Sequence, residues 1–451
     1  MCGIFAAISF NKEGAQCIKA MKPLLIAGAQ KRGRDGDGIY EFSNGYIGAS
    51  RAQPLPEDSN IDIPLYYKNL YMAFNGTISN DKELNEKWNL SVPNEVDTHT
   101  IIQLWDILGG KATCNELVGG YAIAVYDEHW KTLHVAKNFK TLWYSYYPGS
   151  CFLLSSEKEP LIVRENLFSI GYPQRFPTNT TIKISSSGKI TEEKTTRKYW
   201  SYTPDLDDNK AVAVVSGGID SITAAYIGKY IFKHDVTMMH FNYGQLSAIK
   251  EEEAVSCAAY NLNVPYERVD LTRLGEWGSS PLTDPSIPLP LGKQSAESTL
   301  CWTPGRNMLM LAYAAAYAEA KGAKWLYFGN NLEEEATGYS DNDLDFVHLY
   351  NQLLEYGTLK GVQIRRVLAR LMKPEIIRVG NELSIDYSLT WSCDLGGDKP
   401  CGRCGCCTTR RHAFMVAGLP DEQTYENPLQ DNYVGIEPKH YVIKQLIDLL
   451  E

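Results

Sequence analysis

A buried strand that turns directly into a helix is the clearest pattern of apolar and polar positions in this chain. Residues 211–215 are all apolar, and the sequence SGGIDS follows at once at 216–221. Such a run predicts a parallel strand, a tight turn and a helix start. Further strands are expected at 236–241 and 325–329, and further helices at 250–260 and 307–321. This alternation favours a parallel sheet with helices on both faces.

The first 200 residues show a different pattern, in which short runs such as 120–126 and 133–136 predict stacked antiparallel strands. From residue 178 to residue 209 the chain becomes polar, which predicts a hairpin followed by a linker. We therefore expect an α/β protein of two domains, residues 1–200 and 210–451.

Composition and charge narrow the class of protein. The 451 residues are 44% hydrophobic and 22% charged, as in an ordinary globular protein. A formal charge of −10 argues against a surface devoted to nucleic acid. No apolar run approaches the roughly 20 residues of a membrane span, and the start of the chain lacks the pattern of a signal peptide. We expect a cytoplasmic protein without membrane contact.

The turn after the first predicted parallel strand has the chemistry of a phosphate site. Gly217 and Gly218 let backbone N–H groups point inward, and Ser216 and Ser221 add hydroxyl donors at a helix N-terminus. Asp220 is placed to hold Mg²⁺ against the same phosphates. No Gly-Lys-Ser/Thr follows, so this is not the Walker pattern. The alternative is an ordinary strand–turn–helix.

Five of the eleven cysteines fall between residues 393 and 407. Cys393, Cys401, Cys404 and Cys407 have the spacing C-x7-C-x2-C-x2-C, which predicts a closed tetrahedral Zn²⁺ site with a structural role. Cys406 could replace Cys407, although the spacing from Cys404 favours Cys407. An iron–sulfur cluster is the alternative.

The chain begins Met-Cys-Gly-Ile-Phe. Removal of Met1 would leave a thiol and a free α-amine on Cys2, and an amine that titrates near pH 7.7–8.0 can act as the base for its own thiol. With the segments RGRDGDG at 32–38, SR at 50–51, FNG at 74–76 and DT at 97–98, this start resembles the class II glutamine amidotransferases over about the first 165 residues.

That resemblance implies an αββα sandwich of the amino-terminal-nucleophile hydrolases and a role for each matching residue. Cys2 would attack the glutamine amide, and the Asn75 side chain and Gly76 N–H would form the oxyanion hole. Arg51 would bind the substrate carboxylate and Asp97 its ammonium. Thr77 and Arg34 depart from the family pattern, where Glu and Pro are usual, and put glutamine affinity in question.

The second half resembles the PP-loop ATP pyrophosphatases, and more specifically the 7-cyano-7-deazaguanine synthases over residues 210–420. The resemblance is carried by SGGIDS at 216–221, NYGQ at 242–245, PGRN at 304–307, GYSD at 338–341, KPEI at 373–376 and CGRCGCC at 401–407. It implies ATP binding by Ser216, Gly217, Gly218, Asp220 and Ser221. It further implies that Arg306 and Lys373 face phosphate charge, and that Tyr243, Gln245, Tyr339 and Asp341 lie near the deazaguanine.

Departures fall on the substrate side. Asn342 and Asp343 stand where that family usually has Cys and Arg, and Asn242 stands where Asp is common. An Arg lost beside a carboxylate substrate is not neutral, so the deazaguanine assignment is firmer than the product.

Taken together, the resemblances imply an ATP-dependent, AMP-forming ligase that adenylates 7-carboxy-7-deazaguanine or its amide and takes nitrogen from glutamine through Cys2. Its cofactors would be Mg²⁺ and structural Zn²⁺, and we expect a homo-oligomer. One alternative is an amidotransferase that makes the archaeosine-type amidine from the nitrile in tRNA or DNA. Another is a ligase that joins the adenylated deazaguanine to a partner-protein amine in antiviral defence. A non-catalytic binding protein is the last alternative.

Overall fold

The computed structural model describes residues 2–52, 62–92, 96–162, 172–196, 198, 204–278, 280–291, 299–333 and 339–428. Contacts between Cα atoms divide the chain into two compact units, residues 1–200 and residues 201–451. None of the helices in the described ranges is long and apolar enough to cross a bilayer. Each unit is considered by itself below.

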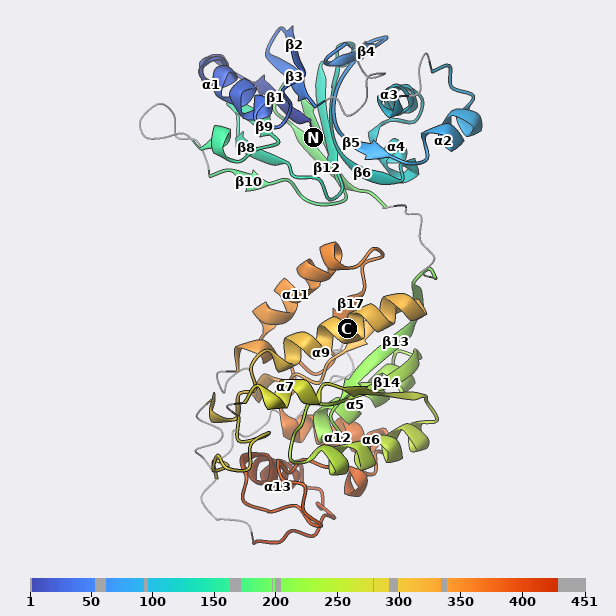
Figure 1. The fold of residues 1–451 in the computed structure, drawn as a ribbon, viewed down its shortest axis with the longest axis vertical. Coiled ribbons are helices and arrows are strands. Elements are labelled where there is room, and N and C mark those ends of the chain that lie inside the picture. Colours follow the sequence, from blue (N-terminus) through green and yellow to red (C-terminus); the bar gives the residue numbers. More distant parts are fainter. Residues whose placement is uncertain are drawn as a thin grey trace. The chain divides into compact units, whose positions relative to one another are not determined.

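The first unit is built on two antiparallel six-stranded sheets (Figure 1). The first has the order β10-β8-β9-β1-β3-β2 and the second β12-β11-β7-β6-β5-β4. The strands of the first sheet are β1 (Gly3–Ser9), β2 (Gly36–Phe42), β3 (Gly45–Arg51), β8 (Trp143–Tyr147), β9 (Cys151–Ser155) and β10 (Gln174–Arg175). Those of the second are β4 (Leu65–Tyr67), β5 (Leu70–Ile78), β6 (Gly119–Asp127), β7 (Thr132–Lys137), β11 (Thr180–Ser185) and β12 (Ile190–Lys194).

Successive side chains of each strand point to opposite faces of its sheet. The buried apolar residues therefore form three layers, one between the two sheets and one on each outer face. Ile4 and Ile47 from the first sheet pack with Val135 and Ile182 from the second in the core between the sheets. Residues of opposite parity in the first sheet pack against α1 (Lys12–Gln30). Those in the second pack on the side of α2 (Asp81–Trp88), α3 (Asp97–Leu108) and α4 (Gly110–Glu116). This is the predicted αββα sandwich, with a helical layer on each outer face (Figure 1).

The second unit contains a five-stranded sheet in which every pair is parallel, in the order β15-β14-β13-β16-β17. Its strands are β13 (Asp207–Val215), β14 (Asp235–Asn242), β15 (Tyr266–Asp270), β16 (Ala323–Tyr327) and β17 (Gln363–Arg365). The polar stretch that predicted a linker up to residue 209 ends earlier, because β13 begins at Asp207. Residues 208–210 are exposed in the structure, so their polarity concealed the strand.

Helices cover both faces of this sheet, as predicted. One core contains side chains of α5 (Ile219–Tyr230), α6 (Ala248–Leu262), α12 (Lys373–Glu382) and α13 (Gly405–Ala417). The opposite core contains side chains of α7 (Thr272–Glu276), α9 (Arg306–Lys321) and α11 (Leu344–Gly357). Short 3₁₀ turns lie at Glu159–Leu161, Thr299–Cys301, Ser340–Asn342 and Tyr387–Leu389. The carboxyl ends of the parallel strands are the expected place for a ligand.

Candidate functional site

A cavity of about 480 Å³ lies at the carboxyl ends of β13, β14 and β16. Its wall contains Val215 from β13, Phe241 from β14 and Phe328 directly after β16. Eight of the residues predicted for the ATP and deazaguanine sites also line it, namely Ser216, Gly218, Asp220, Ser221, Tyr243, Arg306, Tyr339 and Lys373. The parallel sheet thus brings most of the second set of predicted residues to one space.

The turn after β13 is held by its two serines. The Ser216 N–H donates to Ser221 Oγ at 3.1 Å, and the two hydroxyl oxygens are 3.2 Å apart. Gly217 has a φ of +84°, which favours glycine, and its carbonyl accepts from the Trp391 N–H at 2.8 Å. Gly217 itself does not line the cavity, whereas Gly218, the N-cap of α5, does. A helix start with free N–H groups and hydroxyls is suited to phosphate oxygens.

Asp220 and Lys373 form an ion pair at the cavity wall. Asp220 Oδ2 lies 3.1 Å from Lys373 Nζ, and both side chains are largely buried. Asp220 Oδ1 is buried and has no hydrogen-bond partner. A buried carboxylate oxygen without a hydrogen-bond partner, beside the turn after β13, would be suited to hold Mg²⁺, because Mg²⁺ is usually bound by one or two carboxylates together with phosphate oxygens. Glu333, which also lines the cavity, accepts from the Lys373 N–H at 3.2 Å.

Arg306 is anchored by Tyr243. Its Nη1 donates to the Tyr243 hydroxyl at 3.2 Å, and the guanidinium carbon lies 5.4 Å from the centre of the Tyr243 ring. Burial raises the pKa of Tyr243 to about 12, although Arg306 opposes the shift, so the phenol stays neutral. Gln245 lies outside the cavity wall. Its Oε1 accepts from the Tyr243 N–H at 2.8 Å, and its Nε2 donates to Glu251 at 2.8 Å, so it supports the loop that carries Tyr243.

Tyr339 and Asp341 lie close to Arg306. The Tyr339 ring is nearly parallel to that of Trp302, with 6.3 Å between the ring centres. Asp341 is absent from the cavity wall. Burial raises its pKa, and the Arg306 charge works against that shift. The residue Gly338 of the same motif falls outside the described residues.

The departures at residues 342 and 343 have a structural explanation. Asp343 is the N-cap of α11, where its side chain accepts from the Phe346 N–H at 2.7 Å. Asn342 lines the cavity and accepts from the Asn307 amide at 3.3 Å. Asp343 is therefore used to begin a helix, and Asn342 alone presents a new polar group to the cavity.

Three acidic residues of the cavity wall were not predicted from the sequence: Glu251, Glu333 and Asp394. Glu251 accepts from Ser247 at 2.7 Å and from Gln245, and burial raises its pKa while these hydrogen bonds oppose the shift. It lies within the run Lys-Glu-Glu-Glu at 250–253. In the sequence, such a run of charged residues looks like the solvent-exposed face of a helix. Asp394 directly follows Cys393 and could have been suspected only from that neighbour.

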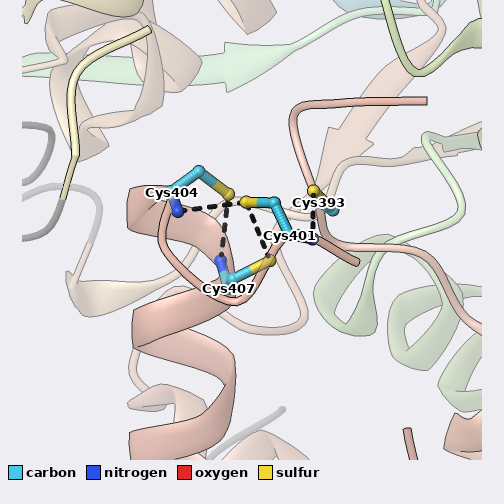
Figure 2. Close-up of side chains that lie close together, drawn as sticks. All are labelled: Cys393, Cys401, Cys404 and Cys407. Carbon is cyan, nitrogen blue, oxygen red and sulfur yellow. Dashed lines mark hydrogen bonds between the residues drawn. The ribbon is translucent and has the colours of Figure 1, made fainter. Parts of the chain in front are cut away.

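The four cysteines predicted to bind metal come together, as Figure 2 shows. The sulfur atoms of Cys393, Cys401, Cys404 and Cys407 all lie within 4.8 Å of one another, and the four side chains are buried. Backbone N–H groups point at the sulfurs, for example from Cys404 to Cys401 Sγ at 3.3 Å. A tetrahedral Zn²⁺ with bonds of about 2.3 Å needs similar separations. Cys406 is exposed and outside the cluster, so Cys407 is the fourth member.

The first unit contains the other set of predicted residues. Cys2 is partly buried, directly precedes β1, and its thiol lies 3.9 Å from the Ala52 carbonyl oxygen. β1 pairs with β3 so that Gly3 is opposite Ser50, which places Arg51 beside the start of β1. Cys2 has the same parity as Ile4, and Arg51 has the same parity as Ala49. Ile4 and Ala49 face the core between the sheets. Arg51 and Cys2 are thus directed to one end of that inter-sheet space.

Asn75 lies on β5 in the second sheet, with the parity of Ala73, and so faces the same space. It is buried, and its Nδ2 has no hydrogen-bond partner. Gly76 is so close to β6 that a Cβ atom would lie 2.3 Å from the Gly120 carbonyl oxygen. An unpaired amide donor next to an N–H that only glycine can supply at this spacing is suited to an oxyanion.

Asp97 begins α3 and is tied to the end of β5. Its Oδ2 accepts from the Ile78 N–H at 3.0 Å. Burial raises the pKa of Asp97 to about 6, and the Ile78 hydrogen bond opposes the shift. The carboxylate is therefore ionised at neutral pH and available for a cation.

Comparison with known proteins finds matches to two different families in two separate parts of the chain. A model of the glutamine amidotransferase domain matches residues 1–173, and the model described as queuosine biosynthesis protein QueC matches residues 210–418. The 7-cyano-7-deazaguanine synthase of Caldicellulosiruptor bescii is 38% identical over 219 residues, which are 48% of this chain and 97% of that protein. This chain belongs to the 7-cyano-7-deazaguanine synthase family.

Some members of this family match nearly the whole chain, whereas others match about half of it. The 7-cyano-7-deazaguanine synthase 2 of Sulfurisphaera tokodaii is 29% identical, and the match covers 95% of this chain and all of that protein. The synthase of Methanocaldococcus jannaschii is 36% identical, over 48% of this chain and 99% of its own length. This 7-cyano-7-deazaguanine synthase homologue is thus an ATP-dependent ligase with a fused glutamine amidotransferase domain.

Proposed function

We propose that this enzyme adenylates the carboxylate of 7-carboxy-7-deazaguanine and replaces AMP by ammonia taken from glutamine. A carboxylate oxygen would attack the α-phosphorus of ATP, and pyrophosphate would leave. Ammonia would then attack the acyl carbon, and AMP would leave to give the amide. A second adenylation, on the amide oxygen, followed by loss of AMP and protons would give the nitrile. The cavity that combines the phosphate turn, Asp220, Lys373 and Arg306 is the observation that carries this proposal.

The residues of the cavity wall have separate roles in the proposed reaction. Ser216, Gly218 and Ser221 bind phosphate oxygens, and Lys373 neutralises charge that develops on them. Mg²⁺ bound to Asp220 would supply charge stabilisation for the leaving pyrophosphate. Arg306 is fixed by Tyr243 and binds the substrate carboxylate or its acyl phosphate. Tyr339 contacts the deazaguanine ring, with Asp341 nearby.

In the first unit, the Cys2 thiolate attacks the side-chain amide of glutamine. Asn75 Nδ2 and the Gly76 N–H bind the oxyanion, ammonia leaves, and water releases glutamate from the thioester. Arg51 and Asp97 select a free amino acid because one binds its carboxylate and the other its ammonium.

We further propose that the four-cysteine cluster binds Zn²⁺ with a structural role. Four thiolates leave no open coordination position, and the cluster is enclosed by its own loop and the start of α13.

Identification of the reaction product distinguishes the proposed function from its alternatives. The purified protein is incubated with ATP, Mg²⁺ and glutamine, and with either the carboxy- or the cyano-deazaguanine, and products are identified by mass spectrometry. We expect amide and nitrile from the acid, with AMP formed at each step, and no reaction of the cyano compound. Conversion of the nitrile to an amidine would contradict the proposal in favour of the amidotransferase alternative. AMP formation without amide or nitrile would point to capture by another amine.

A further inference from the structure

Lys137, the last residue of β7, is a buried cation that the proposed chemistry does not yet use. Its side chain is completely inaccessible to solvent. Lys137 Nζ has no hydrogen-bond partner. Such a group is unfavourable, because an ammonium ion without a partner in a protein interior loses its hydration and gains nothing in return.

The sheet register places Lys137 in line with the proposed oxyanion donor. Asn75 pairs with Ala122, Ala122 pairs with Lys137, and Lys137 pairs with Thr180. Directly paired residues of an antiparallel sheet point to the same face. Ala122 belongs to the core between the two sheets, so Asn75 and Lys137 both face that core. Two strand spacings separate their backbones by on the order of 10 Å.

The charges near Lys137 add to its own. Burial, together with the smaller effect of the positive charge of Arg175, lowers the pKa of Lys137 to about 8. The side chain therefore carries its charge at neutral pH. Lys194 donates to the hydroxyl of the neighbouring Thr180 at 3.0 Å. Lys194 is paired with Glu192 at 3.6 Å, whereas no carboxylate of the described residues forms an ion pair with Lys137.

We propose that Lys137 stabilises, through space, the negative charge that forms on the glutamine oxyanion during attack by Cys2. The inference rests on the glutaminase activity proposed above. A cation that is unpaired in the resting enzyme gains its counter-charge only when the oxyanion forms, which is the condition for lowering a barrier instead of strengthening ground-state binding. Inside a sandwich that excludes water, such a field is weakly screened over this distance.

The test uses three variants of the full chain and measures glutamate formation and thermal unfolding for each. Lys137→Met removes the charge and keeps the length of the side chain. Lys137→Arg keeps a charge that does not titrate. Lys183→Met is the matched control, because Lys183 lies on the adjacent strand β11 and is exposed.

Lys137→Met should lower kcat/KM for glutamine about ten- to thirty-fold, mainly through kcat, and should melt at the same or a higher temperature. In the wild type, kcat/KM should fall as pH rises through about 8, because Lys137 loses its charge. That alkaline decline should be absent in both variants, with low kcat/KM in Lys137→Met and higher kcat/KM in Lys137→Arg, because the Arg charge does not titrate. Lys183→Met should match the wild type.

Unchanged kcat/KM in Lys137→Met would overturn the proposal. So would a loss of activity together with a lower melting temperature and an unchanged pH profile, since that combination describes a packing role. A wild type that releases no glutamate would instead contradict the proposed glutaminase, which separates the two failures.

Discussion

Burial and neighbouring groups shift the pKa values of individual side chains in this protein. Asp97 is the clearest case in the first unit, because burial raises its pKa to about 6 while the Ile78 N–H holds one of its oxygens. A carboxylate that binds an ammonium ion must be ionised. Its function should therefore depend on pH just below neutrality.

Asp97→Asn should raise the KM for glutamine ten-fold or more, because a charge-assisted contact is lost. In the wild type the same KM should rise as pH falls through about 6, since protonation removes the charge. Steady-state glutaminase kinetics between pH 5 and pH 8 measure both effects. Asp106→Asn is the control, because Asp106 lies on the same helix and pairs with the exposed Lys68. Equal KM values at all pH values would remove Asp97 from the glutamine site.

Asp220 is the residue on which the adenylation chemistry depends most. Asp220→Asn weakens the ion pair with Lys373 and removes the proposed Mg²⁺ ligand, so AMP formation should fall by about a hundred-fold or more. Stopped assays of AMP release measure the change. Glu253→Gln on the exposed face of α6 is the control. Adenylation at the wild-type rate in Asp220→Asn would show that the metal lies elsewhere.

At the scale of elements, the regular parts of the fold were predictable and the supporting contacts were not. The strand at 236–241 and the helix at 307–321 each match an observed element to within one or two residues at each end, because each is rich in apolar residues that become buried in the sheet or against it. Gln245 was placed near the substrate on motif alone. It bonds instead to the backbone of its own loop, which depends on tertiary packing that no local period encodes.

The same limit explains the residues that sequence reasoning missed. Glu251 belongs to an acidic helical segment, and only the fold shows that it faces the cavity. Lys137 ends a strand that alternates normally, so nothing in the pattern distinguished a buried lysine from an exposed one. By contrast, the spacing of the cysteines sufficed to select Cys407 over Cys406, because a short loop fixes which sulfurs can meet.

The cysteine cluster joins the segment after residue 391 to the start of α13. Cys401→Ser should lose the metal, lower the melting temperature of the second unit on the order of 10 °C, and expose the amides of α13 to exchange, since metal binding and folding are coupled at such sites. Cys406→Ser should keep both metal and melting temperature. Metal analysis, calorimetry and hydrogen exchange test this. Unchanged stability after complete loss of metal would contradict the structural role.

At the scale of the whole molecule, the chain combines two sets of chemistry in two units. The first has the residues proposed as nucleophile, as oxyanion donors and as the charges that bind free glutamine. The second has a cavity at the carboxyl edge of a parallel sheet, lined by the proposed phosphate-binding turn and the proposed metal ligand. Neither set alone forms a C–N bond from glutamine. The central claim is therefore that nitrogen released by Cys2 becomes part of the deazaguanine product.

Isotope transfer tests that claim most directly. The protein is given ATP, Mg²⁺, 7-carboxy-7-deazaguanine and glutamine labelled with ¹⁵N in the side-chain amide, and the product is examined by mass spectrometry. The account predicts a product that is heavier by one mass unit in the wild type. With Cys2→Ala it predicts no product from glutamine, but normal product from added ammonium. An unlabelled product, or a labelled one that forms equally well without the Cys2 thiol, would contradict the account.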